Sequence, residues 1–194
     1  MTEREPAPPG ALADELHVSL PPTRLAAHHD AFSYRIIDSP LGDLLVARTP
    51  SGIARVAFAR EGFSRVLESL SEQLHPRPVP ARSSLDHAAR AIDAYFAGTA
   101  STISLPIDLQ LVTGFQRTVI DHLPSIGYGA TASYAAVAAG VGRPGASNAV
   151  GVACRSNPLP IVMPCHRAVR SDGSLGAYVG GTEAKRVLLA LEAS

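Results

Sequence analysis

The sequence of 194 residues predicts an α/β protein with two lobes, a small N-terminal α/β lobe of antiparallel sheet and helices followed by a mostly helical C-terminal lobe. Short apolar runs with two-residue alternation, separated by Pro and Gly, fill the first half and are typical of strands. From residue 115 the apolar residues recur at helical spacing instead. We place the lobes at residues 31–112 and 113–194, and we expect the Pro-rich residues 1–30 to form a flexible tail.

The N-terminal lobe begins with three alternating runs that predict an antiparallel meander, and a fourth short strand closes the lobe. We expect these strands at residues 32–37, 43–47, 53–58 and 103–107. Two helices are expected at residues 64–74 and 85–96. Val66, Leu70 and Leu74 share one face of the first helix, which ends where His75-Pro76 follows.

The C-terminal lobe is expected to contain four helices, at residues 115–123, 134–139, 147–155 and 182–191. Ser133 can cap the second of them, and the glycines from residue 140 end it. Because Arg143-Pro144-Gly145 then turns the chain, the second and third helices have the outline of a helix-turn-helix. That outline alone does not indicate DNA binding, since many helical pairs without a DNA function share it.

Composition and charge exclude several classes of protein. Lys+Arg and Asp+Glu number 17 each, which excludes a strongly basic nucleic-acid coat or a polybasic membrane arm. Residues 116–194 nevertheless carry three more basic than acidic side chains, so an anionic partner is expected there. The sequence has no apolar run long enough for a transmembrane helix and no secretion signal, and we therefore expect a cytoplasmic protein without membrane association.

Cys154 and Cys165 are the two cysteines, too few for a disulfide framework or a four-cysteine zinc site, and we expect both as free thiols. Cys165 and His166 stand at the end of residues 157–169, which we interpret as a short apolar strand bounded by prolines. A cysteine is a nucleophile only as the thiolate, and His166 is a candidate base. Because neighbouring side chains on an extended chain point apart, a turn or a bridging water is favoured over direct contact. Glu192, at the end of the last helix, is a candidate to orient the imidazole.

Residue types alone leave other interpretations of this pair open. A Cys-His dipeptide is most often a small buried residue beside a surface histidine. A zinc site is disfavoured, because adjacent ligands have awkward geometry and Cys154 with distant histidines completes a poor set. A Cys-His-Glu hydrolase is compatible with the residue types.

The motif PCHRAV, preceded by NPLPIVM and followed by GAYVGG and KRVLLALE, resembles the active-site region of the O6-alkylguanine-DNA alkyltransferases, also called methylated-DNA–protein-cysteine methyltransferases. The resemblance extends from about residue 115 to residue 192 and includes GFQRTVIDHL and YGATASYAAVAAGVGRPGA. The preceding lobe, with SPLGDLLVA and DAYFAG, is similar more loosely. A pattern of this length outweighs the interpretation of Cys165 as a plain buried residue.

The resemblance implies a DNA repair protein that moves the methyl or alkyl group from O6-alkylguanine in double-stranded DNA to Cys165, in one irreversible stoichiometric step; O4-methylthymine is a further candidate substrate. It implies that His166 is a water-mediated base, that Glu192 orients it, and that Asn157 braces the active-site segment. Tyr134 would hydrogen-bond the flipped base and stabilise the leaving guanine. No metal or other cofactor is implied, and we expect a monomer.

The same resemblance implies the residues that contact the substrate. The extruded base needs a pocket, so the reading requires a cleft at Cys165 wide enough for a purine. The candidates for base binding are Ala168, Tyr178, Val179, Gly180 and Cys154. The helix-turn-helix would lie in the minor groove, where small residues allow close approach. The candidates for DNA binding are Ser133, Tyr134, Ala146, Ser147, Asn148, Ala149, Gly151 and Arg155.

The sequence departs from the family pattern at two informative positions. Asn148 replaces the arginine that usually fills the space left by the flipped base, which predicts weaker base extrusion and weaker duplex affinity. This difference keeps open an alternative, a regulatory or non-repairing DNA-binding homologue that recognises alkylated guanine. Val179 is larger than the usual residue and is expected to narrow the pocket in favour of methyl adducts.

Overall fold

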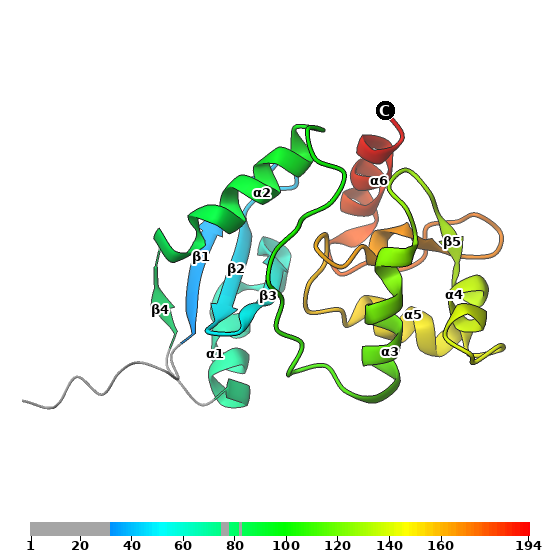
Figure 1. Ribbon diagram of the computed structural model, residues 1–194, viewed down its shortest axis with the longest axis horizontal. Helices are drawn as coiled ribbons and strands as arrows, with labels where there is room; N and C mark the ends of the chain where they lie inside the picture. Colours follow the sequence, from blue (N-terminus) through cyan, green and yellow to red (C-terminus); the bar gives the residue numbers. More distant parts are fainter. Residues whose placement is uncertain (1–31, 75–77, 82) are drawn as a thin grey trace, which may run out of the picture.

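The computed structural model describes residues 32–74, 78–81 and 83–194 (Figure 1). The sheet and its helices form one side of the molecule, and the helices of the C-terminal half form the other. The segment that joins them runs down the middle, between the two lobes. This arrangement confirms the predicted α/β class with a helical C-terminal part. The tail expected at residues 1–30 lies outside the described residues.

The N-terminal sheet has the strand order β3-β2-β1-β4. Its strands are β1 (Ser33–Ile37), β2 (Leu44–Thr49), β3 (Gly52–Phe58) and β4 (Val79–Pro80). The first three form the predicted antiparallel meander, whereas β4 pairs with β1 in parallel and was not predicted. Alternate side chains of the central strand β2 point to opposite faces, and both faces are buried. Leu45 packs toward helix α1 (Phe63–Leu74), and Leu44 packs into the main core beside α2 (Asp86–Phe96).

The strand predicted at residues 103–107 is wrong. Within this segment only Ile107 forms a bridge, in parallel with Ile53, and the rest crosses between the lobes without strand pairing. Pro106 lacks an N–H and cannot donate to a ladder. Its carbonyl instead accepts from Ile53 N at 2.8 Å, and Gly52 lies so close that a Cβ there would stand 2.6 Å from the Pro106 backbone.

The C-terminal half confirms the predicted helices to within about one residue at each end. They are α3 (Gly114–His122), α4 (Tyr134–Gly140), α5 (Ser147–Arg155) and α6 (Gly181–Glu192). Ser133 caps α4 as expected, because Ala136 N donates to its hydroxyl at 3.0 Å. Two short strands, β5 (Ala132–Ser133) and β6 (Ala168–Val169), pair in parallel and hold the segment after the cysteine next to the start of α4. The described residues also form the 3-10 helices η1 (Ala59–Glu61), η2 (Ser83–Leu85), η3 (Leu123–Ser125) and η4 (Cys165–Arg167).

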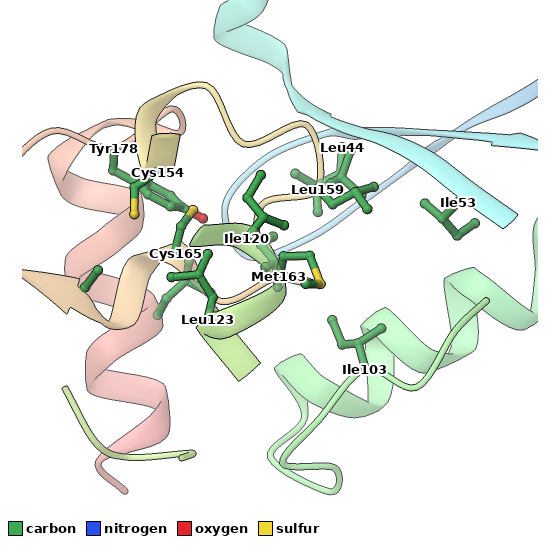
Figure 2. Close-up of a cluster of buried hydrophobic side chains, with 14 of the residues drawn as sticks. Leu44, Ile53, Ile103, Ile120, Leu123, Cys154, Leu159, Met163, Cys165 and Tyr178 are labelled. Atoms are coloured by element: carbon green, nitrogen blue, oxygen red, sulfur yellow. The ribbon is translucent and has the colours of Figure 1, made fainter. Parts of the chain in front are cut away.

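One hydrophobic core joins the two lobes. Leu44 and Ile53 of the sheet belong to the same buried cluster as Ile120 and Leu123 of the helical half. Figure 2 shows that Cys165 lies within this cluster. Because the active-site candidate segment lies where the lobes meet, residues of both lobes can position it. No helix among the described residues is long and apolar enough to cross a membrane.

Candidate active site

The segment before the cysteine is a series of turns, so the strand predicted at residues 157–169 is wrong apart from the two residues of β6. Its prolines remove backbone donors, and Ile161 has a positive φ of 72°, a strained conformation for a β-branched residue. Asn157 holds the turns together. Its side-chain amide donates to Met163 O at 2.9 Å, and its side-chain oxygen accepts from Leu159 N at 2.9 Å. These two bonds fix the turns that lead to Cys165. Strain of this kind collects at functional sites.

The N-terminal lobe fixes the outer side of these turns. Val56 N of β3 donates to Pro158 O at 2.8 Å, and the Arg55 guanidinium donates to the same oxygen at 3.2 Å. The Arg55 side chain is itself held by Glu61. A strand of the sheet therefore anchors the segment that leads to Cys165.

The thiol of Cys165 is buried. The function predicted from the sequence requires a cleft at the sulfur wide enough for a purine, and the described residues leave no such opening there. Cys165 is 1% exposed and His166 is 0% exposed. Tyr178 belongs to the same buried cluster as Cys165 (Figure 2), and its ring packs edge-on against the His166 ring, with 6.4 Å between centroids. Burial raises the pKa of Cys165 to about 11, against the opposing effects of the Asn157 hydrogen bond and the nearby Lys185 charge, so the resting group is the neutral thiol.

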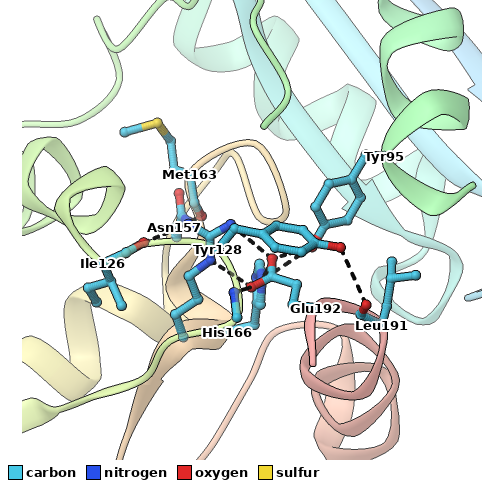
Figure 3. A network of polar contacts seen from close by, with 10 residues as sticks. Tyr95, Ile126, Tyr128, Asn157, Met163, His166, Leu191 and Glu192 are labelled. Carbon is cyan, nitrogen blue, oxygen red and sulfur yellow. Dashed lines mark hydrogen bonds and ion pairs between the residues drawn. The ribbon is translucent and has the colours of Figure 1, made fainter. Parts of the chain in front are cut away.

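His166 is held by Glu192 in one tautomer (Figure 3). Its Nε2 lies 2.9 Å from Glu192 Oε1. Burial alone would raise the pKa of Glu192, but hydrogen bonds from His166, Arg167 and Tyr95 outweigh it and bring the pKa to about 2. The carboxylate can therefore only accept, and Nε2 carries the proton. Burial lowers the pKa of His166, although Glu192 opposes this, which favours the neutral imidazole.

The second ring nitrogen of His166 is then a free acceptor. Nδ1 is buried and has no hydrogen-bond partner among the described residues. No hydrogen bond joins it to the adjacent thiol within this part of the chain, in line with the expectation that Cys165 and His166 do not meet directly. A buried imidazole nitrogen without a partner is the acceptor that a water-mediated base requires.

Two residues that hydrogen-bond to Glu192, Tyr95 and Arg167, were not predicted from the sequence. Tyr95 of α2 donates its hydroxyl to Oε1 at 2.6 Å, across the boundary between the lobes. Arg167 donates from Nε to Oε2 and from Nη2 to Oε1, both at 2.9 Å, and from Nη1 to Ile126 O at 2.6 Å. A bidentate ion pair of this kind fixes both the position of the carboxylate and the orientation of its plane. The adjacency of Arg167 to the Cys-His pair was a signal for it, whereas Tyr95 lies about seventy residues away and carries no local signal.

A third missed residue, Lys185 of α6, lies on the other side of the thiol. It is 0% exposed and donates from Nζ to Ala168 O at 2.5 Å, with its Nζ also 5.7 Å from the centre of the Tyr134 ring. Cys154 lies nearby and is buried, which raises its thiol pKa to about 12. The candidates Ala168, Cys154 and Tyr134 thus gather around a buried ammonium next to Cys165. Lys185 is the only lysine in a chain that otherwise uses arginine, and this was the available signal.

Val179 and Gly180, two of the candidates for base binding, lie against the N-terminal lobe. Val179 lines a cavity of about 450 Å³ between the lobes, together with Asn157 and Pro158. A Cβ on Gly180 would stand 2.6 Å from the Phe58 ring, so the close approach that this glycine allows is to the N-terminal lobe. Tyr178 also packs on Phe58, edge-on with 5.8 Å between ring centroids.

The remaining candidates lie on one face. Tyr134, Ser147, Asn148, Gly151 and Arg155 line a separate cavity of about 350 Å³. We call it the α5 cavity; its other lining residues are Val152, Arg170, Ser171 and Ala177. Ala149 is exposed and Ala146 half-buried on the same helix-turn-helix, and the Ser133 hydroxyl is occupied by its capping bond. Among the described residues, no three His, Cys, Asp or Glu side chains are grouped to hold a metal ion.

The α/β fold with a buried Cys-His-Glu arrangement defines a candidate cysteine nucleophile, and comparison with known sequences identifies the family. Residues 32–109 match the family described as 6-O-methylguanine DNA methyltransferase, ribonuclease-like domain. Residues 114–194 match its DNA binding domain. The chain therefore belongs to the 6-O-methylguanine DNA methyltransferase family, the methylated-DNA–protein-cysteine methyltransferases of DNA repair, which act in a single turnover.

Individual relatives support this assignment along most of the chain. The methylated-DNA–protein-cysteine methyltransferase of Mycobacterium tuberculosis is 38% identical over 161 residues, which cover 83% of this chain and 92% of the relative. The constitutive enzyme of Bacillus subtilis is 38% identical over 160 residues, 82% of this chain and 94% of the relative. The crystal structure of the M. tuberculosis O6-methylguanine methyltransferase matches with a TM-score of 0.71 at 37% identity, covering 84% of this chain and 93% of that one. A structure of the M. tuberculosis protein in complex with DNA also has a TM-score of 0.71, at 38% identity, covering 83% and 92%.

Proposed function

We propose that this protein repairs O6-alkylguanine in double-stranded DNA by moving the alkyl group to Cys165 Sγ in one irreversible step, after the base has been extruded from the duplex. The observation that carries the proposal is the free Nδ1 of His166 beside the thiol, with Nε2 fixed by a carboxylate of pKa about 2. A base held in one tautomer next to a nucleophile is the arrangement that covalent catalysis requires. O4-methylthymine is a second candidate substrate, and the cytoplasm is the proposed compartment.

In the proposed step the thiol proton passes through a water molecule to His166 Nδ1 as sulfur attacks the alkyl carbon. A sulfur–carbon bond forms, the carbon–O6 bond breaks, and its electron pair leaves with guanine. The Tyr134 hydroxyl and the backbone N–H groups at Tyr178 and Val179 stabilise the guanine anion, which takes up one proton to replace the proton lost by the thiol. The reaction leaves an S-alkylcysteine, so each molecule acts once.

The DNA-binding surface is proposed to be α5 and the turn before it, placed in the minor groove. Asn148 and Ala149 are exposed on this helix. Because Cys165 is 1% exposed, entry of the base must displace the segment that carries Tyr178. We propose that the monomer does this on binding DNA, with the extruded base moving past Tyr134.

The alternative is a homologue that binds alkylated DNA without repairing it, and Asn148 in place of the usual arginine favours it. Intact mass separates the two. The protein is incubated with a short duplex carrying one O6-methylguanine, alongside Cys165→Ala and the matched thiol variant Cys154→Ala. Repair adds one methyl group to the wild type and to Cys154→Ala but not to Cys165→Ala. Unchanged mass of the wild type together with retained duplex binding would refute repair and support the alternative.

A further inference from the structure

The α5 cavity is lined by two positively charged side chains, Arg155 and Arg170. Arg155 comes from the last turn of α5, and Arg170 comes from the loop that directly follows β6. None of the residues that line the cavity is acidic. The hydroxyls of Ser147 and Ser171 and the ring of Tyr134 supply further polar groups to the lining. A concave site with two cations and several hydroxyl donors suits a phosphate group.

Arg170 is held by its backbone while its side chain is free. Its N–H donates to Ser174 O at 2.9 Å, and its carbonyl accepts from Gly173 N at 3.0 Å, which makes a tight turn. The carboxylate of Asp172 accepts from the N–H and hydroxyl of Ser174 at 2.9 and 2.7 Å; these bonds lower the pKa of Asp172, and the Arg170 charge adds to the effect. In the described part of the chain the Arg170 guanidinium forms no hydrogen bond or ion pair, and the side chain is exposed. An unpaired guanidinium on a rigid turn is available to a ligand at low entropic cost.

The position of Arg170 relative to the thiol indicates which phosphate it would meet. Tyr134 lines the α5 cavity and also lies over Lys185, beside Cys165. Burial raises the pKa of Tyr134, whereas the charges of Arg170 and Arg155 oppose this, as expected for two cations near its hydroxyl. A base that passes Tyr134 toward the sulfur must leave its own phosphate at the cavity.

We propose that Arg170 binds the phosphate of the extruded nucleotide in the cavity that Arg155 also lines. The inference rests on the proposed function, since it assigns a phosphate contact to the same DNA complex. Arg170 thereby adds a cation to a cavity at which α5 carries Asn148 in place of the usual arginine. Arg170 holds the displaced backbone in the open position, and the guanidinium fork suits two phosphate oxygens at once.

The test compares Arg170→Gln with Arg90→Gln, a matched loss of one exposed positive charge on α2 of the other lobe. Both are made in the Cys165→Ala background to prevent reaction, and duplex binding is measured between 50 and 200 mM salt. Arg170→Gln should weaken binding to an O6-methylguanine duplex about tenfold and lower the slope of log K against log salt by about 0.9. The loss should be smaller on unmodified duplex, and Arg90→Gln should match the parent. Equal behaviour of the two variants, or equal loss on both duplexes, would overturn the inference.

A second measurement separates this inference from the proposed function. With Cys165 present, methyl transfer is followed from the duplex and from the free base O6-methylguanine, which has no phosphate. Arg170→Gln should transfer from the free base at the wild-type rate and from the duplex about tenfold more slowly at subsaturating DNA. Slowing on both substrates would contradict a phosphate contact. If the wild type transfers methyl from neither, the proposed function fails, while the binding comparison still decides whether Arg170 contacts phosphate.

Discussion

Replacing Glu192 with glutamine should destabilise the protein and slow alkyl transfer together. The carboxylate of Glu192 accepts from Tyr95, from His166 and twice from Arg167, and it is 4% exposed. An amide of the same shape offers only one oxygen, so at least one of these buried donors loses its acceptor. The Arg167 cation also loses its counter-charge while it stays buried. Breaking one side of a buried ion pair costs about 3–5 kcal/mol.

The pKa of Glu192 gives a second route to the same magnitude. Its value of about 2 in the folded protein, against an ordinary 4.5, corresponds to about 3 kcal/mol of stabilisation by the charged form. Because the folded pKa is depressed, this stabilisation is complete above pH 4.5 and is lost as the pH falls toward 2. The difference in unfolding free energy between wild type and Glu192→Gln should therefore shrink across that window.

The assay is thermal and urea unfolding at pH 7, with Glu183→Gln as the control. Glu183 lies on the same helix and pairs with Arg186, but both side chains are exposed, so its loss should cost less than about 1 kcal/mol. Glu192→Gln should lower the melting temperature by roughly 6–20 °C. The methyl-transfer rate, measured below that temperature, should fall by about 10² because His166 is no longer held in one tautomer. If Glu192→Gln has the same melting temperature as Glu183→Gln, the buried network does not stabilise the fold as described.

Three further predictions concern other parts of the site. Tyr95→Phe removes a hydroxyl that donates to Glu192 and should lower the unfolding free energy by about 1.5–3 kcal/mol in urea titrations; no change would show that the contact between the lobes is dispensable. Alkylation of Cys165 by iodoacetamide, followed in Cys154→Ala, should be slow at pH 7 and rise about tenfold per pH unit toward pH 10; a plateau near pH 7 would mean that the thiol is already ionised. Asn148→Arg should tighten duplex binding several-fold and steepen its salt dependence by about one phosphate contact, and unchanged binding and transfer rates would remove Asn148 as the cause of weak extrusion.

The sequence predicted the helices and the three-stranded meander because their signals are local. Helical spacing of apolar residues, Ser133 before α4 and the glycines after it fix those ends within a residue or two. The strand predicted for residues 157–163 was wrong because an apolar run bounded by prolines shows neither the helical nor the strand period. Its turns depend on Asn157, whose bonds to Leu159 and Met163 cannot be deduced from spacing.

The sequence predicted the reacting residues of the candidate site, but it did not predict the residues that other parts of the fold bring to them. Cys165, His166 and Glu192 were found through a motif and a resemblance. The donors that hold Glu192 were not, because Tyr95 reaches it from the other lobe and is brought there only by packing of α2 on the shared core. Burial of Cys165 was also missed, since local sequence does not show how Tyr178 folds over the thiol.

The covered thiol implies that proton removal belongs to the transfer step and does not precede it. Burial raises the pKa of Cys165 to about 11 and lowers the pKa of His166, so moving the proton from sulfur to imidazole in the closed site is unfavourable. The closed protein therefore holds a neutral thiol beside a neutral imidazole, a pair that is inert toward solvent electrophiles. In the proposed reaction, displacing Tyr178 admits water and the base together, which removes the burial that raises the thiol pKa and depresses the imidazole pKa. In this proposal the movement that brings the alkyl carbon to the nucleophile also activates it, and a molecule that can react only once is protected from reacting without DNA.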